Sequence, residues 1–205
     1  MVELVPGVFA GPRLRQSNCY LVHDKTLTVL VDAGMPSDRQ EISRWLSESG
    51  WRLDAVVLTH GDVDHRGQAA QLASALGAQV WAGSEERSFL EGALRPRRLV
   101  RRVMAQLMRP VAVDRWLDPG AEVAGFAVWH TPGHTAGHLS LVRLADRVVI
   151  AGDALVVGRQ GPIMPRSWLN EDQEQARASA TRLMAIGPSW LLTGHGPPWH
   201  QPRAD

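Results

Sequence analysis

One stretch of the chain restricts its fold more than any other. Residues 53–60, LDAVVLTH, are almost wholly apolar, which is typical of a strand that is buried on both faces. A helical pattern follows from Gln68 to Leu76, then Gly77 and a second apolar run, AQVWAG. These segments predict a β-α-β unit and therefore an α/β fold.

The loop between this strand and this helix carries a high density of potential metal ligands. The stretch THGDVDHRG, residues 59–67, contains His60, Asp62, Asp64 and His65. Two carboxylates and two imidazoles this close repel one another or lose hydrogen bonds unless a cation organises them. Loops at the carboxyl ends of strands are also where open α/β sheets bind their ligands. We interpret the stretch as part of a metal site.

Three candidates of the same kind occur later in the chain: His134 in TPGHTAGH, Asp153 in IAGDA and His195 in LLTGHG. Each follows an apolar, strand-like run or lies in a glycine-rich turn after one. Taken alone, His134 fits a hydrogen-bonded turn and Asp153 fits a turn or a helix cap. A sheet that sets these strand ends side by side would bring all the candidates into one cleft, and together they predict a metal centre.

The remaining segments fit the same α/β pattern. SNCYLVH and TLTVLVDAG predict a hairpin, and a helix is expected from Ser37, as its N-cap, to Ser49. The second half predicts three strands, FAVWH, HLSLVRL and RVVIAG, then a helix over residues 171–186 and a closing strand, WLLTG.

Composition limits the class of protein. The formal net charge is +1, so nothing draws the whole chain toward nucleic acid or an anionic membrane. The single cysteine, Cys19, excludes an internal disulfide, and no run approaches the roughly 20 apolar residues of a membrane span. The first residues lack the pattern of a signal peptide. We expect one cytoplasmic domain over residues 1–205 that acts on a small molecule; the oligomeric state stays open.

A basic segment interrupts this pattern. No acidic residue occurs from Ala93 to Val113, and six arginines lie there, which predicts a basic amphipathic helix inserted at about residues 91–112. It is either a solvated surface stripe or a lid whose guanidinium groups bind a carboxylate or phosphate of the substrate. The candidate substrate-binding residues are Arg98, Arg101 and Arg102, with Trp116 and Trp168 as apolar walls.

In order and spacing, THGDVDHRG, TPGHTAGH, AGD and TGHG resemble the motifs of the metallo-β-lactamase-fold superfamily, and VDAG matches its early strand. The resemblance implies a four-layer αβ/βα sandwich with a two-metal site at one edge of two sheets. It implies that one metal is bound by His60, Asp62 and His134, the second by Asp64, His65 and His195, with Asp153 bridging them. Asp32 and His138 would support the ligands from outside the metal sphere.

Position 62 departs from the usual family motif, which has a histidine where this chain has Asp62. Together with Asp64, Asp153 and a bridging hydroxide, Asp62 would neutralise two divalent ions and make them weaker Lewis acids. We expect zinc, but a hard carboxylate ligand shifts the preference toward manganese or iron. The alternative is that Asp62 points away and leaves the first site weak or empty.

The resemblance implies a metal-dependent hydrolase. A hydroxide bridging the two metals would attack an ester, thioester, lactone or related bond, with Asp64 and Asp153 as the catalytic carboxylates. TPGHTAGH is similar to the corresponding stretch of glyoxalase II and lactonase-type members. The alternatives are a redox enzyme with one or two irons, which Asp62 favours, a phosphodiesterase or nuclease, and a metal-stabilised binding module.

Overall fold

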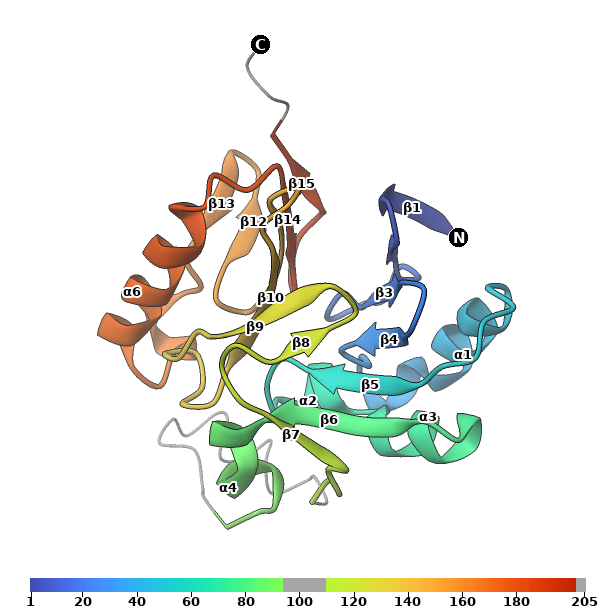
Figure 1. Ribbon diagram of the computed structural model, residues 1–205. Coiled ribbons are helices and arrows are strands. Elements are labelled where there is room, and N and C mark those ends of the chain that lie inside the picture. The colour runs from blue at the N-terminus through green and yellow to red at the C-terminus, as the bar shows by residue number, and fades with distance from the viewer. Residues whose placement is uncertain (94–109, 202–205) are drawn as a thin grey trace.

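The computed structural model describes residues 1–93 and 110–201. Within these residues, two sheets face each other and helices flank them on both sides (Figure 1). The first sheet has seven strands in chain order: β1 (Val2–Val5), β2 (Val8–Ala10), β3 (Tyr20–His23), β4 (Thr28–Val31), β5 (Ala55–Leu58), β6 (Gln79–Gly83) and β7 (Arg115–Leu117). It is antiparallel up to β4 and parallel from β4 to β7.

The second sheet has six strands, in the order β15 (Trp199–His200), β14 (Trp190–Thr193), β11 (Val148–Gly152), β10 (Leu139–Arg143), β9 (Phe126–His130) and β8 (Glu122–Val123). Only β11 and β14 pair in parallel. A small hairpin joins β12 (Val156–Gly158) to β13 (Gly161–Ile163). Among the described residues, the α-helices are α1 (Arg39–Ser47), α2 (Val63–Arg66), α3 (Ala69–Leu76), α4 (Arg87–Leu90) and α6 (Gln173–Met184), and the 3₁₀ turns are η1 (Pro36–Asp38), η2 (Ser84–Glu86) and η3 (Ser167–Leu169).

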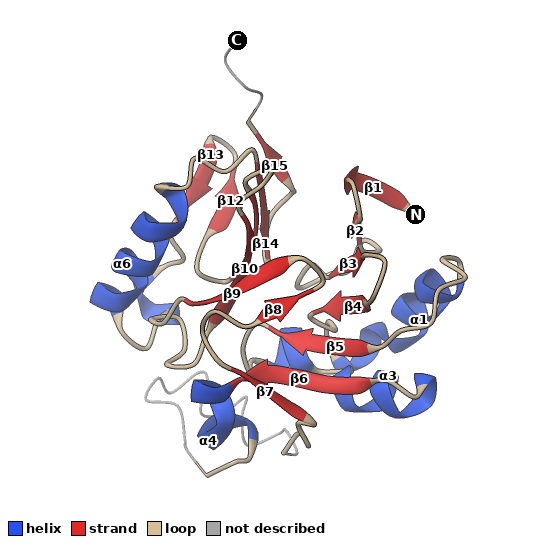
Figure 2. Ribbon diagram, in the orientation of Figure 1, coloured by secondary structure: helices blue, strands red, loops and turns tan. Residues whose placement is uncertain are grey.

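Three apolar clusters create the layers. Alternate residues of β5 point in opposite directions, so Val57 packs between the two sheets while Val56 packs against the helices outside the first sheet. The outer cluster includes Ile42 of α1 and Leu72 of α3, and a third cluster places Leu183 of α6 against the second sheet. Helices, sheet, sheet and helix thus form the predicted αβ/βα sandwich (Figure 2).

The predicted β-α-β unit is present as β5, α3 and β6. All four residues of β5 are buried, and β5 pairs in parallel with β4 on one side and β6 on the other. Gly77 ends α3 in the left-handed conformation, with φ 66°. The predicted hairpin is β3 and β4, whose turn is closed by the carboxylate of Asp24, which accepts hydrogen bonds from the backbone N–H groups of Thr26 and Leu27.

Several expected boundaries were wrong. Ser37 does not cap a helix; it lies inside η1, because Pro36 starts a 3₁₀ turn one residue earlier, and α1 begins at Arg39. The helix expected over residues 171–186 is shorter, since Asp172 caps α6 by accepting bonds from two backbone N–H groups. Helix α2 was not expected and starts within the ligand-rich stretch itself. The predicted basic helix falls largely on residues 94–109, outside the described part of the chain.

Candidate metal centre

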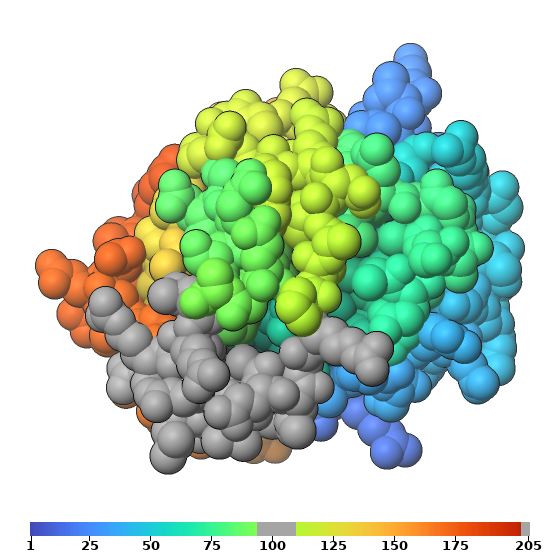
Figure 3. Space-filling view, turned by 90° about the horizontal axis from the view of Figure 1, so that it is seen from below, coloured from blue at the N-terminus to red at the C-terminus, as the bar shows by residue number. Residues whose placement is uncertain are grey.

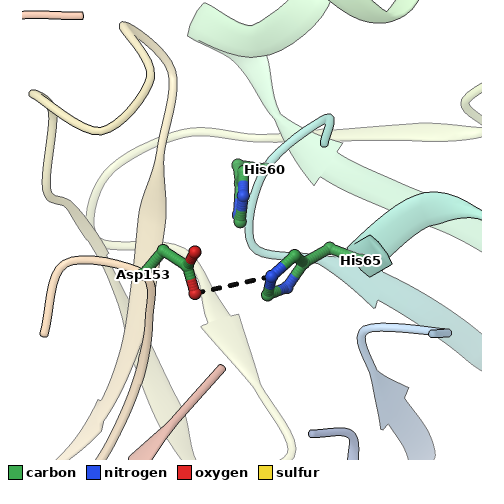
Figure 4. Close-up of side chains that lie close together, drawn as sticks. All are labelled: His60, His65 and Asp153. Atoms are coloured by element: carbon green, nitrogen blue, oxygen red, sulfur yellow. Dashed lines mark ion pairs between the residues drawn. The ribbon is translucent and has the colours of Figure 1, made fainter. Parts of the chain in front are cut away.

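The fold brings all seven candidate ligands to one edge of the two sheets. His60 and Asp62 follow β5, and α2 carries Asp64 and His65 on its single turn. The second sheet supplies the others from three segments: His134 lies between β9 and β10, Asp153 follows β11, and His195 follows β14. Figure 4 shows three of these side chains, His60, His65 and Asp153, converging from the two sides.

The candidate ligand atoms of the described residues form three compact groups, of which His60, His65 and Asp153 make one and the two predicted metal sites make the others. The first ligand group is the site of His60, Asp62 and His134: Asp62 Oδ2 lies 3.6 Å from His60 Nε2 and 3.2 Å from His134 Nε2. The second ligand group is the site of Asp64, His65 and His195, with Asp64 Oδ2 3.8 Å and 3.5 Å from the Nε2 atoms of His65 and His195. Each group therefore offers two imidazoles and one carboxylate.

Asp153 lies between the two groups. Its Oδ1 is 3.4 Å from His65 Nε2, and its Oδ2 is 3.5 Å from His134 Nε2 and 3.2 Å from His195 Nε2. The chain can approach this carboxylate because residue 194 is glycine: a Cβ on Gly194 would lie 2.2 Å from Asp153 Oδ1. The geometry is that of a carboxylate able to bridge two cations.

The charges of the candidate ligands shift one another's pKa values. Burial opposes a charged His65, but the carboxylates around it, Asp153 and then Asp32, raise its pKa to about 10. Burial also opposes a charged Asp153, yet the surrounding imidazoles, His65 foremost, hold the pKa of Asp153 well below its usual range. Burial, and then the charge of His65, lower the pKa of His60. A metal ion at this position competes with protons for the same nitrogen atoms.

The buried polar atoms of the centre indicate whether a metal ion fits there. His60 Nε2, His65 Nε2 and Asp153 Oδ1 are buried and have no hydrogen-bond partner. A buried polar atom without a partner costs roughly 1–3 kcal/mol, so three of them pointing into one space require compensation. Nitrogen and carboxylate oxygen are the ligand atoms that zinc, manganese and iron accept. The residues present fit such ions.

Hydrogen bonds on the far side of the imidazoles fix which nitrogen faces the centre. Asp32 Oδ2 accepts from His65 Nδ1 at 2.8 Å, and Asp32 also accepts from the hydroxyl of Thr59, at 2.9 Å. Because that hydroxyl donates to Asp32, its oxygen is left to accept from His60 Nδ1, 3.0 Å away. One carboxylate thus orients both imidazoles and leaves their Nε2 lone pairs for a metal.

A comparison with known protein families agrees with this geometry. The chain matches the family model described as the metallo-beta-lactamase superfamily over residues 12–195. The chain belongs to the metallo-beta-lactamase superfamily. It is therefore an enzyme of a metal-binding hydrolase superfamily, and both the predicted family and the predicted fold are confirmed.

Individual members of the superfamily resemble the chain along most of its length. Hydroxyacylglutathione hydrolase GloC of Haemophilus influenzae is 29% identical over 189 residues, which cover 88% of this chain and 86% of the relative. The probable metallo-hydrolase YflN of Bacillus subtilis is also 29% identical, covering 96% of this chain and 86% of its own. The crystal structure of TTHA1623 in a di-iron-bound form has a TM-score of 0.74 and 28% identity, covering 94% of both chains.

Two further candidate ligands, His134 and His195, are held by partners that the sequence patterns do not reveal. Asn170 is fully buried after η3, and its Oδ1 lies 3.3 Å from His134 Nδ1. The backbone carbonyl of Gln16 accepts from His195 Nδ1 at 2.8 Å. Both partners come from segments far from their histidines in the sequence, so only the folded chain shows them. With these bonds all four imidazoles present Nε2 to the centre.

His138 holds the backbone of Asp153 in place. The N–H of Asp153 donates to His138 Nε2 at 3.0 Å, so His138 Nδ1 carries the proton and donates to Thr131 Oγ1 at 2.9 Å. Burial, and then the charges of His60 and His134, lower the pKa of His138 well below its usual value. His138 is therefore neutral and holds the backbone of Asp153, while its ring nitrogens are both engaged.

Among the described residues, no hydrogen bond or ring contact joins Trp116 or Trp168 to a candidate ligand, and the three candidate arginines lie outside those residues. Trp116 is half-buried on β7, packs against the cluster outside the first sheet, and has the guanidinium of Arg87 4.3 Å from its ring. Trp168 lies in η3 and is 51% exposed. Arg98, Arg101 and Arg102 fall outside the described part of the chain, and their role as substrate-binding residues remains a proposal.

Asp32→Asn is expected to weaken metal binding by about 10–100-fold, the usual effect of removing an outer partner of a ligand. An asparagine offers only one acceptor oxygen to the donors of Thr59 and His65, and its amide nitrogen cannot accept from either. The measurement is a zinc titration of the metal-free protein against a competing chelator. The matched control is Asp54→Asn, which removes a carboxylate bonded to Thr28 N–H, at the start of β4 in the same sheet. Equal metal affinity in both variants would contradict the orienting role of Asp32.

Proposed function

We propose that the protein hydrolyses an ester, thioester or lactone bond of a small molecule at this centre. The observation that carries the proposal is the division of the ligands into two groups of two imidazoles and one carboxylate with Asp153 between them. The residues of the two groups would hold two divalent ions, which would supply an activated water and a Lewis acid for the carbonyl of the substrate.

The described residues perform the positioning that this chemistry needs. The Nδ1 hydrogen bonds to Asp32, Thr59, Asn170 and the carbonyl of Gln16 fix the ligating nitrogens before any metal arrives. Asp62 and Asp64 supply one carboxylate to each group, and Asp153 contributes to both. The site thus needs no side-chain nucleophile of its own.

Among the described residues, the candidate ligands differ in their exposure to solvent. The side chains of His60 and His65 are 0% exposed, whereas those of His195, Asp64 and Asp62 are 33%, 23% and 19% exposed. Structural metal sites are closed by protein ligands, while catalytic ones keep an open face. We infer that substrate reaches the centre between Asp62 and His195.

Thioesters are the first substrates to test, because GloC of H. influenzae is named as a hydroxyacylglutathione hydrolase. We propose zinc as the bound metal, with manganese or iron as alternatives that the carboxylate of Asp62 favours. No helix of the described residues is long and apolar enough to cross a membrane. The cytoplasmic location stays a prediction.

A redox function is the second candidate. A carboxylate in each ligand group suits iron, and the similar structure of TTHA1623 is in a di-iron-bound form. An iron-loaded protein that consumes oxygen and does not hydrolyse carbonyl substrates would favour this candidate.

The test is elemental analysis of protein purified without affinity metals or chelators, followed by assays of thioesters, esters, lactones and phosphodiesters. We expect about two metal equivalents per chain and turnover of a thioester or ester. Turnover should disappear on chelation and return with the metal. A fully loaded protein that turns over none of the carbonyl substrates would contradict the proposal, and activity that survives complete metal removal would contradict it equally.

A further inference from the structure

Glu86 is a buried carboxylate close to the metal centre, at the end of η2. It is 2% exposed and accepts three hydrogen bonds from donors among the described residues. The backbone N–H of Gly61 donates to Oε1 at 2.9 Å, while the hydroxyl of Thr135 and the N–H of Gly137 donate to Oε2 at 2.9 Å and 3.0 Å. None of these donors belongs to a ligand side chain.

The donors belong to the two loops that carry the first ligand group. Gly61 stands between His60 and Asp62, and Thr135 follows His134. The first loop leaves the first sheet after β5, and the other joins two strands of the second sheet, so the carboxylate of Glu86 connects the sheets at this edge. In Figure 3 the segment that contains η2 and α4 is green and lies at the surface.

The packing around Glu86 leaves little room for the loops to shift. A Cβ on Gly137 would lie 2.1 Å from the backbone nitrogen of Glu86, so this loop rests directly on η2. A Cβ on Gly61 would lie 2.4 Å from a ring carbon of Phe89 in α4 and 3.1 Å from Glu86 Oε1. Both loops are therefore in contact with the same short segment.

We propose that Glu86 is a positioning residue for the first metal site, setting the distance between the His60–Asp62 loop and His134. The inference rests on the proposed metal centre and adds to it a residue that touches no metal. Bonds from N–H or O–H donors to a carboxylate are about twice as strong as neutral ones. Three such bonds from two loops hold the ligands of that site in place before a metal binds.

The positive charge of Arg66 favours the ionised form of Glu86. Arg66, on α2, is 4% exposed; burial lowers its pKa, and the charges of Asp62 and Glu86 partly offset that shift because they favour the charged guanidinium. A buried carboxylate stripped of its hydrogen bonds would be costly, whereas one with three donors and a cation close by is compensated.

The second ligand group is held by other contacts. Asp32 orients His65, the carbonyl of Gln16 orients His195, and the hydroxyl of Ser17 donates to the backbone carbonyl of Asp64. Glu86 takes part in none of these bonds. Loss of its carboxylate should therefore affect the first site selectively.

Glu86→Gln tests the proposal, because glutamine keeps the shape but replaces one acceptor oxygen with a donor. In a zinc titration of the metal-free protein against a competing chelator, we expect affinity at the first site to fall by about 10–100-fold. Affinity at the second site should stay at the wild-type value. Glu85→Gln, at the exposed neighbouring position, is the matched control and should bind zinc like the wild type.

Thr135→Val is the second variant and keeps the proposal testable if Glu86→Gln does not fold. It removes one donor to Glu86 Oε2 and should weaken the first site in the same selective way, by a smaller factor. Equal weakening of both sites, or no change at either, would overturn the positioning role while the metal centre itself stands. A wild-type protein that binds fewer than two zinc ions would instead overturn the proposed centre, and this inference with it.

Discussion

Asp153→Asn is expected to reduce turnover by at least about 10³-fold, the upper end of the loss when one electrostatic contact to a transition state is removed. Asp153 faces imidazoles of both ligand groups, at 3.5 Å from His134 Nε2 in the first and 3.2 Å from His195 Nε2 in the second, so both metal sites should weaken together. An asparagine has one carbonyl oxygen in place of two charged ones and cannot bridge in the same way. The measurements are turnover on the best substrate and zinc stoichiometry by titration.

The control for this variant is Asp146→Asn in the turn between β10 and β11. Asp146 is 41% exposed and pairs with Arg143 at 2.8 Å, so its loss should change stability by no more than about 1 kcal/mol and leave zinc binding intact. Thermal unfolding of the metal-free proteins establishes that each variant is folded. An Asp153→Asn protein that still binds two ions and turns over at half the wild-type rate would end the bridging model.

Asp62→Ala is expected to remove one of two metal equivalents per chain. Asp62 Oδ2 lies near the Nε2 atoms of both His60 and His134, and without it the first group has two imidazoles and no carboxylate of its own. Affinity at the first site should fall by more than about 100-fold, since even an outer partner of a ligand can contribute that much. The measurement is metal stoichiometry by elemental analysis after dialysis against a weak chelator.

Asp62→His is the informative companion because it restores the residue that the family motif usually has at this position. It should keep two equivalents of zinc while removing one negative charge from the centre, which makes the bound ions stronger Lewis acids. If Asp62→Ala bound two ions as tightly as the wild type, Asp62 would not be a ligand, and the first site would depend on other groups.

Local patterns in the sequence predicted much of the fold. The apolar run that became β5 predicted its burial on two faces, and the helix and second apolar run that follow it predicted a parallel neighbour. The high density of candidate ligands after that strand predicted a metal site from the sequence alone. The family match over residues 12–195 then confirmed the sandwich.

What the sequence did not reveal depends on long-range contacts. Asn170 is 36 residues from His134, and Glu86 is 25 residues from Gly61 and 49 from Thr135. No period or spacing links such pairs, because their distance is set by the packing of whole sheets and helices. The start of α1 was misplaced for a local reason instead, since a serine before an apolar stripe suggested a cap and the adjacent Pro36 starts a separate turn.

Each ligand group draws side chains from both sheets. His60 and Asp62 enter from the first sheet and His134 from the second; Asp64 and His65 enter from the first and His195 from the second. An ion bound to either group would thus link the two sheets of the sandwich. Because ligands that bind only the folded state stabilise it by mass action, such an ion would stabilise the fold. In a cell short of metal, this protein would lose abundance as well as activity, because the metal-free protein unfolds more often and is then degraded by proteases.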